Sequence, residues 1–193
     1  MKHFKYLGAR IEANGKSAPE IRRRLAMARS KLKKMTNIWK GQCIRTKVKI
    51  LKSVVFPTAT YGCEAWTIGK TESRKITAFE MTCYRRILRI SWTEKQTNKE
   101  VLKKIGIKSP TLLQTVKKKQ YFGHTTRHES LEKHILQTKV DGKRGRGRPT
   151  RRWEQDIQEW MNMTTTQATR LADDRNLFRR KIREATSYKG TAD

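Results

Sequence analysis

The sequence predicts an all-α fold with one short strand at the N-terminus. Apolar residues recur at intervals of three and four along most of the chain, and proline or glycine stands at the ends of these rows. Only residues 3–11 have a strand-like pattern. The 193 residues carry a net charge of +29 and only 35% are hydrophobic, but five Trp, five Tyr and five Phe can form a small core.

The first and longest predicted helix begins at Ser17-Ala18-Pro19-Glu20, a pattern typical of a capping box with proline in the first turn. Apolar residues then recur at spacings of four and three, which predicts one continuous helix of about six turns. This row is Ile21, Leu25, Ala28, Leu32, Met35 and Trp39. The basic residues outside the row would face solvent and bind a polyanion: Arg22, Arg23, Arg29, Lys33, Lys34 and Lys40.

Two further helices are predicted before residue 92. One ends near Pro57, because proline cannot continue a helix, and the other is capped by Thr71. Their inward-facing residues are Ile44, Val48, Leu51 and Val55 in the first helix, and Ile76, Phe79, Cys83, Ile87 and Ile90 in the second.

The remaining predicted helices are shorter and are marked by local start and stop signals. In chain order they are 98–105 closed by Gly106, a helix opened by Ser109-Pro110 that contains Leu113 and Val116, a helix after Pro149-Thr150 that contains Trp153, Ile157 and Trp160, and 167–185.

The positive charge is concentrated in parts of the chain. Residues 21–60 hold twelve Lys or Arg and no acidic residue, and Gly142–Arg152 holds six basic residues in eleven. Phosphates neutralise such surfaces, and glycine lets the backbone approach closely, so nucleic acid is the expected partner. In the second half of the chain the expected contacts are Lys117, Lys118, Lys119, His124, Arg127, Lys143, Arg144, Arg146, Arg148, Arg151 and Arg152.

The core of this segment, Arg146-Gly147-Arg148-Pro149, resembles an AT-hook, an arginine-rich strand that enters the minor groove of A/T-rich DNA. A DNA-binding or architectural protein is therefore an alternative function for the chain. A solvated linker and a nuclear localisation signal are the other interpretations of the segment.

No catalytic centre is expected. Asp173-Asp174 superficially resembles the paired aspartates of a polymerase, but its flanks are helical and basic, so ion pairs with neighbouring arginines are expected instead. His124 and His128 lie four residues apart, but the Glu of an H-E-x-x-H zinc site is missing. We therefore expect no enzyme activity, no metal site, no cofactor and no small-molecule substrate.

The cysteines and the apolar runs indicate in which cellular compartment the protein is found. Cys43, Cys63 and Cys83 form no C-x-x-C pair, which argues against a zinc site or a disulfide scaffold. No apolar run approaches the roughly 20 residues of a membrane helix, and the N-terminus lacks the apolar stretch of a signal peptide. We expect an intracellular, nuclear protein without a membrane partner.

Several short motifs follow one another in a recognisable order. Phe4–Gly8 reads F-K-Y-L-G, Glu20–Ala28 followed by Trp39 continues it, and Tyr61–Trp66 reads Y-G-C-E-A-W. The later motifs are Phe79-Glu80, Tyr84–Leu88, Asn98–Leu102, Gly123–Arg127, Gly142–Trp153 and Ala172 with Asp174-Arg175. In this order, and over nearly the whole chain, they resemble the reverse transcriptases of LINE-type (non-LTR) retrotransposons.

The resemblance implies that residues 1–15 end a palm domain, 16–92 form a helical thumb, and 93–193 form a basic helical C-terminal region with a Gly/Arg linker at 141–152. It implies phosphate contacts with RNA or DNA, either template–primer or target DNA. The family's catalytic aspartates precede the F-K-Y-L-G strand and this chain begins at Met1, so no catalytic residue is carried over. A domesticated copy and a genomic relic without function are the other interpretations.

Overall fold

The computed structural model describes residues 3–13, 15–118, 122–127, 129, 133–134 and 151–186. The described elements are helices apart from an N-terminal hairpin, which confirms the all-α fold class. The chain divides into two compact units, Met1–Val116 (unit 1) and Lys117–Asp193 (unit 2). This division concerns packing alone, and the family-based boundaries at residues 15 and 92 stay a prediction.

The N-terminus forms an antiparallel hairpin of two strands, β1 (His3–Tyr6) and β2 (Ala9–Glu12). The two residues between them, Leu7 and Gly8, both have positive φ, 46° and 76°, as in the tight turns that match the twist of paired strands. The expectation of a single strand is wrong because a leucine occupies a turn position that asparagine or glycine usually takes.

The predicted six-turn helix is two helices. α1 (Ala18–Lys34) ends at Met35, and α2 (Thr36–Gly41) follows it. The break lets Trp39 fold back, so that its indole N–H donates to the Leu32 carbonyl at 2.9 Å. The apolar row continues across the break, which is why the sequence pattern does not reveal it.

The start of α1 is not a capping box. The Ser17 hydroxyl accepts a hydrogen bond from the Thr67 N–H at 3.0 Å and makes no bond to the first turn of α1. The Glu20 carboxylate binds arginines one turn further along the helix. Both side chains of the predicted box therefore serve tertiary contacts.

The helix predicted to end near Pro57 ends at Ala59, and its winding changes from α to π and back before that point. It consists of α3 (Ile44–Ile50), the π-helical turn η1 (Leu51–Val55) and α4 (Phe56–Ala59). Pro57 lies inside this continuous run, just after the π turn and two residues before its last residue, Ala59. In the π turn before it, the Phe56 N–H donates to the Leu51 carbonyl, five residues back.

The second half of unit 1 begins with a single 3-10 turn, η2 (Cys63–Ala65), followed by α5 (Lys70–Leu88), which is capped by Gly69 and not by Thr71. The expected inward residues of α5 are buried, except that Ile90 lies beyond its end and is half-buried. The remaining elements are the 3-10 turn η3 (Trp92–Glu94), α6 (Asn98–Ile105), which Gly106 closes as predicted, and α7 (Leu112–Lys118), whose last two residues are counted with unit 2.

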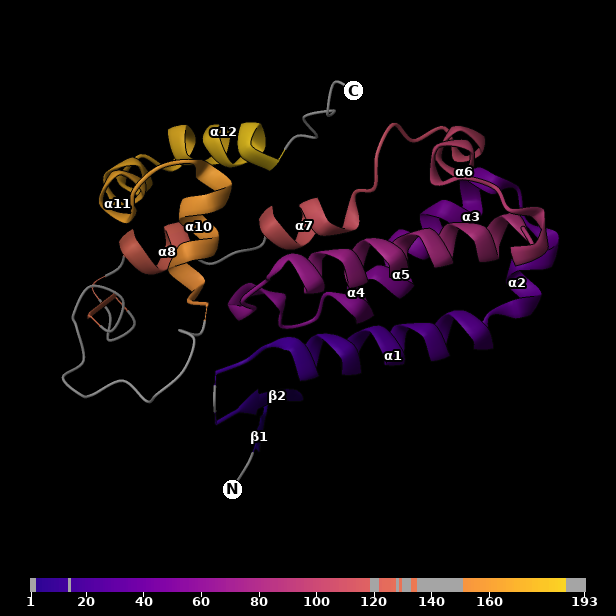
Figure 1. The fold of residues 1–193 in the computed structure, drawn as a ribbon, viewed down its shortest axis with the longest axis horizontal. Helices are drawn as coiled ribbons and strands as arrows, with labels where there is room; N and C mark the ends of the chain where they lie inside the picture. Colours follow the sequence, from indigo (N-terminus) through magenta and orange to yellow (C-terminus); the bar gives the residue numbers. More distant parts are fainter. Residues whose placement is uncertain are drawn as a thin grey trace. The chain divides into compact units, whose positions relative to one another are not determined.

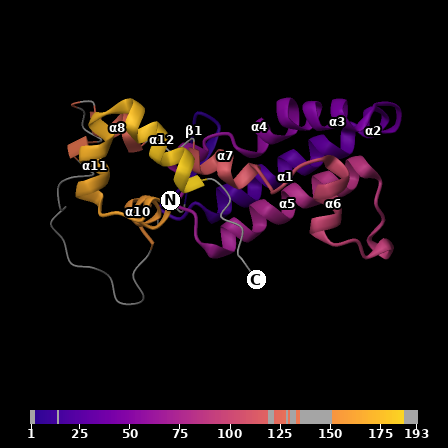
Figure 2. The same ribbon diagram turned by 90° about the horizontal axis from the view of Figure 1, so that it is seen from above.

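Unit 1 is a helical bundle in which α1 packs against α4 and α5. Figures 1 and 2 show α1 and α5 side by side along the unit, with α3 and α4 completing the bundle. The rings of Phe56 and Tyr84 meet edge to face, with centroids 6.3 Å apart. The apolar row of α1 faces this core: Ile21, Leu25, Ala28 and Leu32 are buried, and so is Trp39.

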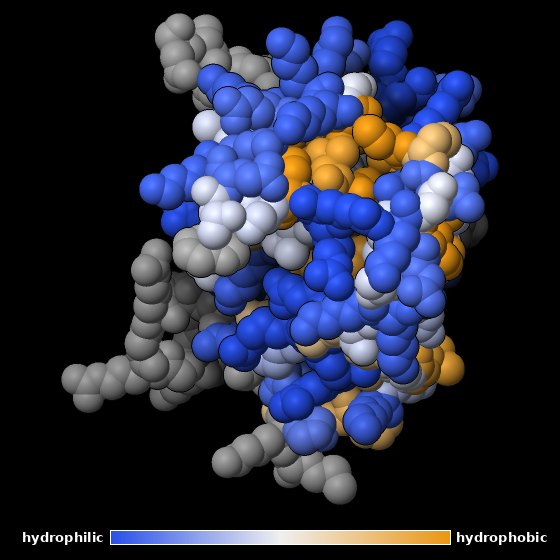
Figure 3. Space-filling model, turned by 90° about the vertical axis from the view of Figure 1, so that its right-hand side faces the viewer, coloured by the Kyte–Doolittle hydropathy of each residue, from blue (hydrophilic) through white to orange (hydrophobic). Residues whose placement is uncertain are grey.

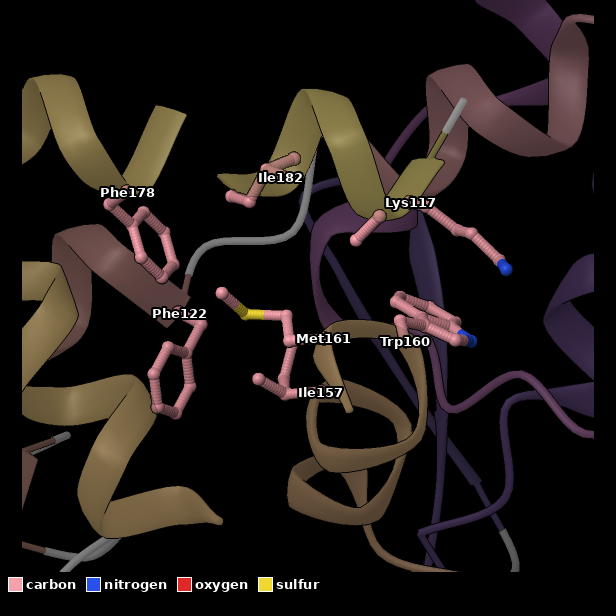
Figure 4. Close-up of a pocket in the computed structure, with 8 residues that line it drawn as sticks. Lys117, Phe122, Ile157, Trp160, Met161, Phe178 and Ile182 are labelled. Atoms are coloured by element: carbon pink, nitrogen blue, oxygen red, sulfur yellow. The ribbon is translucent and has the colours of Figure 1, made fainter. Parts of the chain in front are cut away.

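Unit 2 has a smaller core, in which the rings of Phe122 and Phe178 stack with centroids 6.2 Å apart. Figure 4 shows these rings together with Met161 and Ile157, which point toward one another. Ala168 and Ala172 complete the buried cluster. The described helices that supply these residues are α8 (Phe122–Arg127), α10 (Trp153–Met161), α11 (Thr165–Asp173) and α12 (Arg175–Thr186).

The predicted last helix is likewise two helices, α11 and α12. Asp174 separates them, because its carboxylate accepts from the N–H groups of Asn176 and Leu177 at 2.8 and 3.0 Å. This is the geometry of a helix N-cap, which satisfies donors that the first turn leaves unpaired. The Asp174 carboxylate therefore caps α12 and makes no salt bridge among the described residues, contrary to the expected ion pair with a neighbouring arginine.

Candidate nucleic-acid interface

The hairpin turn of unit 1 is bound by two arginines of α1. Arg23 and Arg24 both donate to the Gly8 carbonyl, and both bind the carboxylate of Glu20. Glu20 is only 3% exposed. A buried ion pair is favourable only when further hydrogen bonds satisfy its atoms, and the Gly8 carbonyl supplies them. This cluster therefore fixes α1 to the hairpin.

Tyr61 joins the same cluster from a distant segment. Its hydroxyl donates to the Leu7 carbonyl at 2.8 Å, and the Arg24 guanidinium lies over its ring, 4.3 Å from the centroid. Two of the motifs that resemble the LINE family, at 4–8 and 61–66, thus meet at the start of α1. Their residues stabilise the fold at this point.

The arginines of this cluster keep Glu20 charged. Burial alone would raise the pKa of Glu20, but the hydrogen bonds from Arg23 and Arg24 outweigh it and hold that pKa below the ordinary 4.5. Arg23 was expected to contact nucleic acid, yet its guanidinium is engaged by Glu20 and Gly8. Its side chain remains 34% exposed.

The other predicted cations of α1 and α2 are exposed. Arg22, Arg29 and Lys33 follow one another at spacings of seven and four residues, which places them in one row along α1, about 16 Å long. The Arg29 guanidinium lies 5.6 Å from the centroid of the Phe79 ring. In the described part of the chain no carboxylate forms a salt bridge with this row or with its neighbours Lys34 and Lys40.

Two predicted cations of unit 2 hold that unit together. Arg127 donates to the Ala172 carbonyl in the last turn of α11 at 2.8 Å. Arg151 binds the carboxylates of Asp156 and Glu159, and Asp156 is fully buried. Both arginines therefore have acceptors inside unit 2.

Lys117 and Arg152 differ from these two. The Lys117 ammonium lies 4.8 Å from the centroid of the Trp160 ring (Figure 4). Burial lowers the pKa of Lys117, and the carboxylates of Glu159 and Asp156 offset this only in part. Arg152 is exposed, and its backbone N–H donates to the Gln155 side chain at 2.9 Å.

The remaining predicted contacts lie outside the described part of the chain. The side chains of Lys118 and His124 lie outside the described part of the chain, although their backbones belong to α7 and α8. The other residues that fall outside the described ranges are Lys119, Lys143, Arg144, Arg146 and Arg148, and with them the AT-hook-like core.

Glu80 has a structural role that the sequence did not indicate. It is fully buried, and its carboxylate accepts from the N–H groups of Thr111 and Leu112 at 2.8 and 2.9 Å, and from the Tyr84 hydroxyl at 2.7 Å. It thereby joins α5 to the start of α7. The available signal was its position beside Phe79, on the apolar face of α5.

Neither a metal cluster nor a membrane helix is found within the described ranges. No three His, Cys, Asp or Glu side chains there come together as a metal ion would require. None of the helices described is both long and apolar enough to cross a membrane.

Comparison with known proteins gives one informative match. The chain is 28% identical over 200 residues to an uncharacterized transposon-derived protein of Caenorhabditis elegans, covering 94% of this chain and 70% of the worm protein. No family model matches the chain, and no solved structure does. The chain is therefore a distant homologue of a transposon-derived protein.

Proposed function

We propose that the chain is the thumb-like and C-terminal part of a LINE-type reverse transcriptase and binds nucleic acid without catalysing a reaction. The observation that carries the proposal is the exposed row Arg22, Arg29 and Lys33, which no carboxylate neutralises in the described structure. The homology to a transposon-derived protein supports a transposon origin. The ordered motifs support the reverse transcriptase family and, with it, a nuclear location.

The row suits a phosphate backbone. Its length of about 16 Å spans several phosphates of one strand, which are spaced about 3.4 Å apart along a duplex axis. Each neutralised phosphate releases counterions, so the affinity should fall steeply with salt. Such contacts carry no base specificity and would hold template–primer or target DNA in position.

The test compares two triple charge reversals in unit 1. R22E/R29E/K33E reverses the row, and K99E/K103E/K104E reverses three exposed lysines of α6 as a matched control. Binding of a labelled RNA–DNA template–primer is followed by fluorescence anisotropy over a salt series. We expect the row variant to bind at least tenfold more weakly and its salt slope to fall by about three. Equal losses in both variants would contradict a specific role for the row.

Two further assays separate the alternatives. Primer extension with template, nucleotides and Mg²⁺ tests the non-catalytic part of the proposal, and robust extension by this chain alone contradicts it. Titration with A/T-rich and G/C-rich duplexes tests the AT-hook interpretation. A strong A/T preference that is lost when Arg146 and Arg148 are replaced by Ala would favour the architectural alternative.

A further inference from the structure

A basic pocket lies between α2 and the C-terminal end of α5 in unit 1. Its volume is about 470 Å³, and half of its eight lining residues are cations. Figure 3 looks at the end of unit 1 that carries α2 and α3, where hydrophilic side chains cover most of the surface. The lining residues are Thr36, Trp39 and Lys40 on one side, and Arg85, Arg86, Arg89, Ile90 and Ser91 on the other.

The cations of this pocket keep their charge uncompensated. The Arg85 guanidinium donates to the Gln96 carbonyl at 3.1 Å and to the Asn98 side chain at 2.8 Å, which fixes its position through neutral acceptors. Arg86 and Arg89 are exposed and have no salt bridge in the described part of the chain. The pocket thus gathers four cations, none of which forms a salt bridge in the described part of the chain.

One carboxylate, that of Glu94, is bound to the lining residue Ser91, so the net charge of the pocket region is lower than its four cations alone would give. The Glu94 carboxylate accepts from the Ser91 N–H at 2.8 Å and from the Gln96 side-chain amide at 2.7 Å. Trp39 is also fixed, because it is 2% exposed and its indole N–H donates to the Leu32 carbonyl. Lining residues that are already held in place, here Arg85 and Trp39, lower the cost of ordering when a ligand binds.

Arg89 occupies a position that favours glycine. It ends α5 in the left-handed conformation, with φ 56° and ψ 31°, and its N–H donates to the carbonyls of Arg85 and Arg86. Glycine adopts this conformation without a steric penalty, whereas arginine pays one. Local strain of this kind collects at functional sites, where the side chain is needed for another purpose.

We propose that this pocket binds a phosphate group of a nucleotide within a nucleic-acid strand. Guanidinium groups present parallel N–H donors that match phosphate oxygens, and three arginines and Lys40 line this pocket. Small-molecule sites usually span about 300–1,000 Å³, so a volume of about 470 Å³ also admits the attached sugar. The strand as the source of the phosphate rests on the proposed function, and a free nucleotide offers the same chemistry.

The experiment compares three variants of the full chain. Arg86→Ala and Arg89→Gly remove pocket cations, and Arg74→Ala removes an exposed arginine of the same helix outside the pocket. We expect the two pocket variants to bind a labelled single-stranded oligonucleotide about tenfold more weakly, and Arg74→Ala to stay within about twofold of the parent. Arg89→Gly should unfold at the same temperature as the parent or higher, so a lost affinity cannot be attributed to unfolding.

Titration with adenosine monophosphate distinguishes the two sources of phosphate. If the chain binds this nucleotide but no oligonucleotide, and Arg89→Gly abolishes the binding, the pocket takes a free nucleotide; that result overturns both the strand as the source of the phosphate and the proposed nucleic-acid function. Oligonucleotide binding that R22E/R29E/K33E weakens but the pocket variants leave unchanged overturns the pocket and leaves the proposed function standing. Equal losses of oligonucleotide affinity in Arg74→Ala and Arg89→Gly also overturn the pocket, because the affinity then depends on total positive charge and not on its position.

Discussion

Units 1 and 2 use their predicted nucleic-acid contacts in different ways. In unit 1, Arg22 and Arg29 face solvent without a carboxylate partner, although Arg24 on the same helix is buried against Glu20. In unit 2, two of the described candidates, Arg127 and Arg151, are engaged by internal acceptors. The described surface for phosphate binding therefore belongs mainly to unit 1.

A buried acceptor decides which arginine becomes structural. The Glu20 carboxylate, the Asp156 carboxylate and the Ala172 carbonyl each lie where an arginine of the same unit can reach them. A buried acceptor without a donor costs free energy, so these contacts form before any ligand binds. A count of basic residues cannot distinguish the two outcomes.

The largest effect is expected at Glu80, because its carboxylate joins α5 to α7. Glu80→Gln places an amide N–H₂ against donors of Thr111 or Leu112, and we expect a loss of about 3 kcal/mol in the free energy of unfolding. Urea unfolding measures it. Glu72→Gln, on the first turn of the same helix, is the control and should cost about 0.5 kcal/mol or less. Similar losses in both variants would contradict the role of Glu80.

The contrast between Arg24 and Arg22 is expected to come next. Arg24→Ala breaks the buried contact with Glu20 and the Gly8 carbonyl, and should cost about 2–3 kcal/mol, since Arg23 still pairs with Glu20. Arg22→Ala should cost less than about 0.5 kcal/mol and weaken template–primer binding instead. Thermal unfolding and anisotropy on the same two proteins measure both quantities. A destabilised Arg22 variant would remove the distinction between the two faces of α1.

Arg127 tests the corresponding arrangement in unit 2. Arg127→Ala leaves the Ala172 carbonyl without its donor, and we expect a loss of about 1–2 kcal/mol confined to unit 2. Hydrogen exchange should become faster in α8 and α11 and stay unchanged in α1 and α5. Arg170→Ala, an exposed arginine on α11, serves as the control. Faster exchange throughout unit 1 would show that the units unfold together.

Local signals predicted the local parts of the fold. The helix α6 has the predicted bounds, and the structure shows that both of its caps are local: Thr97 with Glu100 at the start and Gly106 at the end. The break at Met35 was missed because it depends on Trp39 returning to Leu32, which the helical period cannot reveal. The hairpin was missed because its turn begins with Leu7.

The candidate site was predictable to a similar degree. Helical spacing placed Arg22, Arg29 and Lys33 outside the apolar row, and all three are exposed. The engagement of Arg23 depends on the hairpin turn, which is distant in the sequence. The basic pocket was missed because its lining comes from α2 and α5, although the pattern Arg85-Arg86-x-x-Arg89 was visible.

The smallest effect concerns alkaline pH and again separates a buried group from an exposed one. Burial, with a smaller contribution from the Glu80 carboxylate, raises the pKa of the Cys83 thiol from 9.0 to about 12. The unfolded chain releases this proton near pH 9 while the folded chain keeps it, so stability falls as the pH rises between these two values. The loss attributable to Cys83 should reach about 1.4 kcal/mol at pH 10. Urea unfolding at pH 8, 9 and 10 measures it.

The matched variants decide whether burial of Cys83 is the cause. Cys83→Ala should flatten the decline between pH 8 and 10, even if its stability at pH 8 is lower. Cys43→Ala should leave the decline in place, because Cys43 is exposed and hydrogen bonds with Thr46 lower its pKa, which acts in the opposite direction. Tyr84 adds a further decline above pH 10, since burial raises its pKa as well. If the free energy of unfolding of Cys83→Ala falls with pH as steeply as that of the parent, groups other than Cys83 cause the loss of stability at alkaline pH.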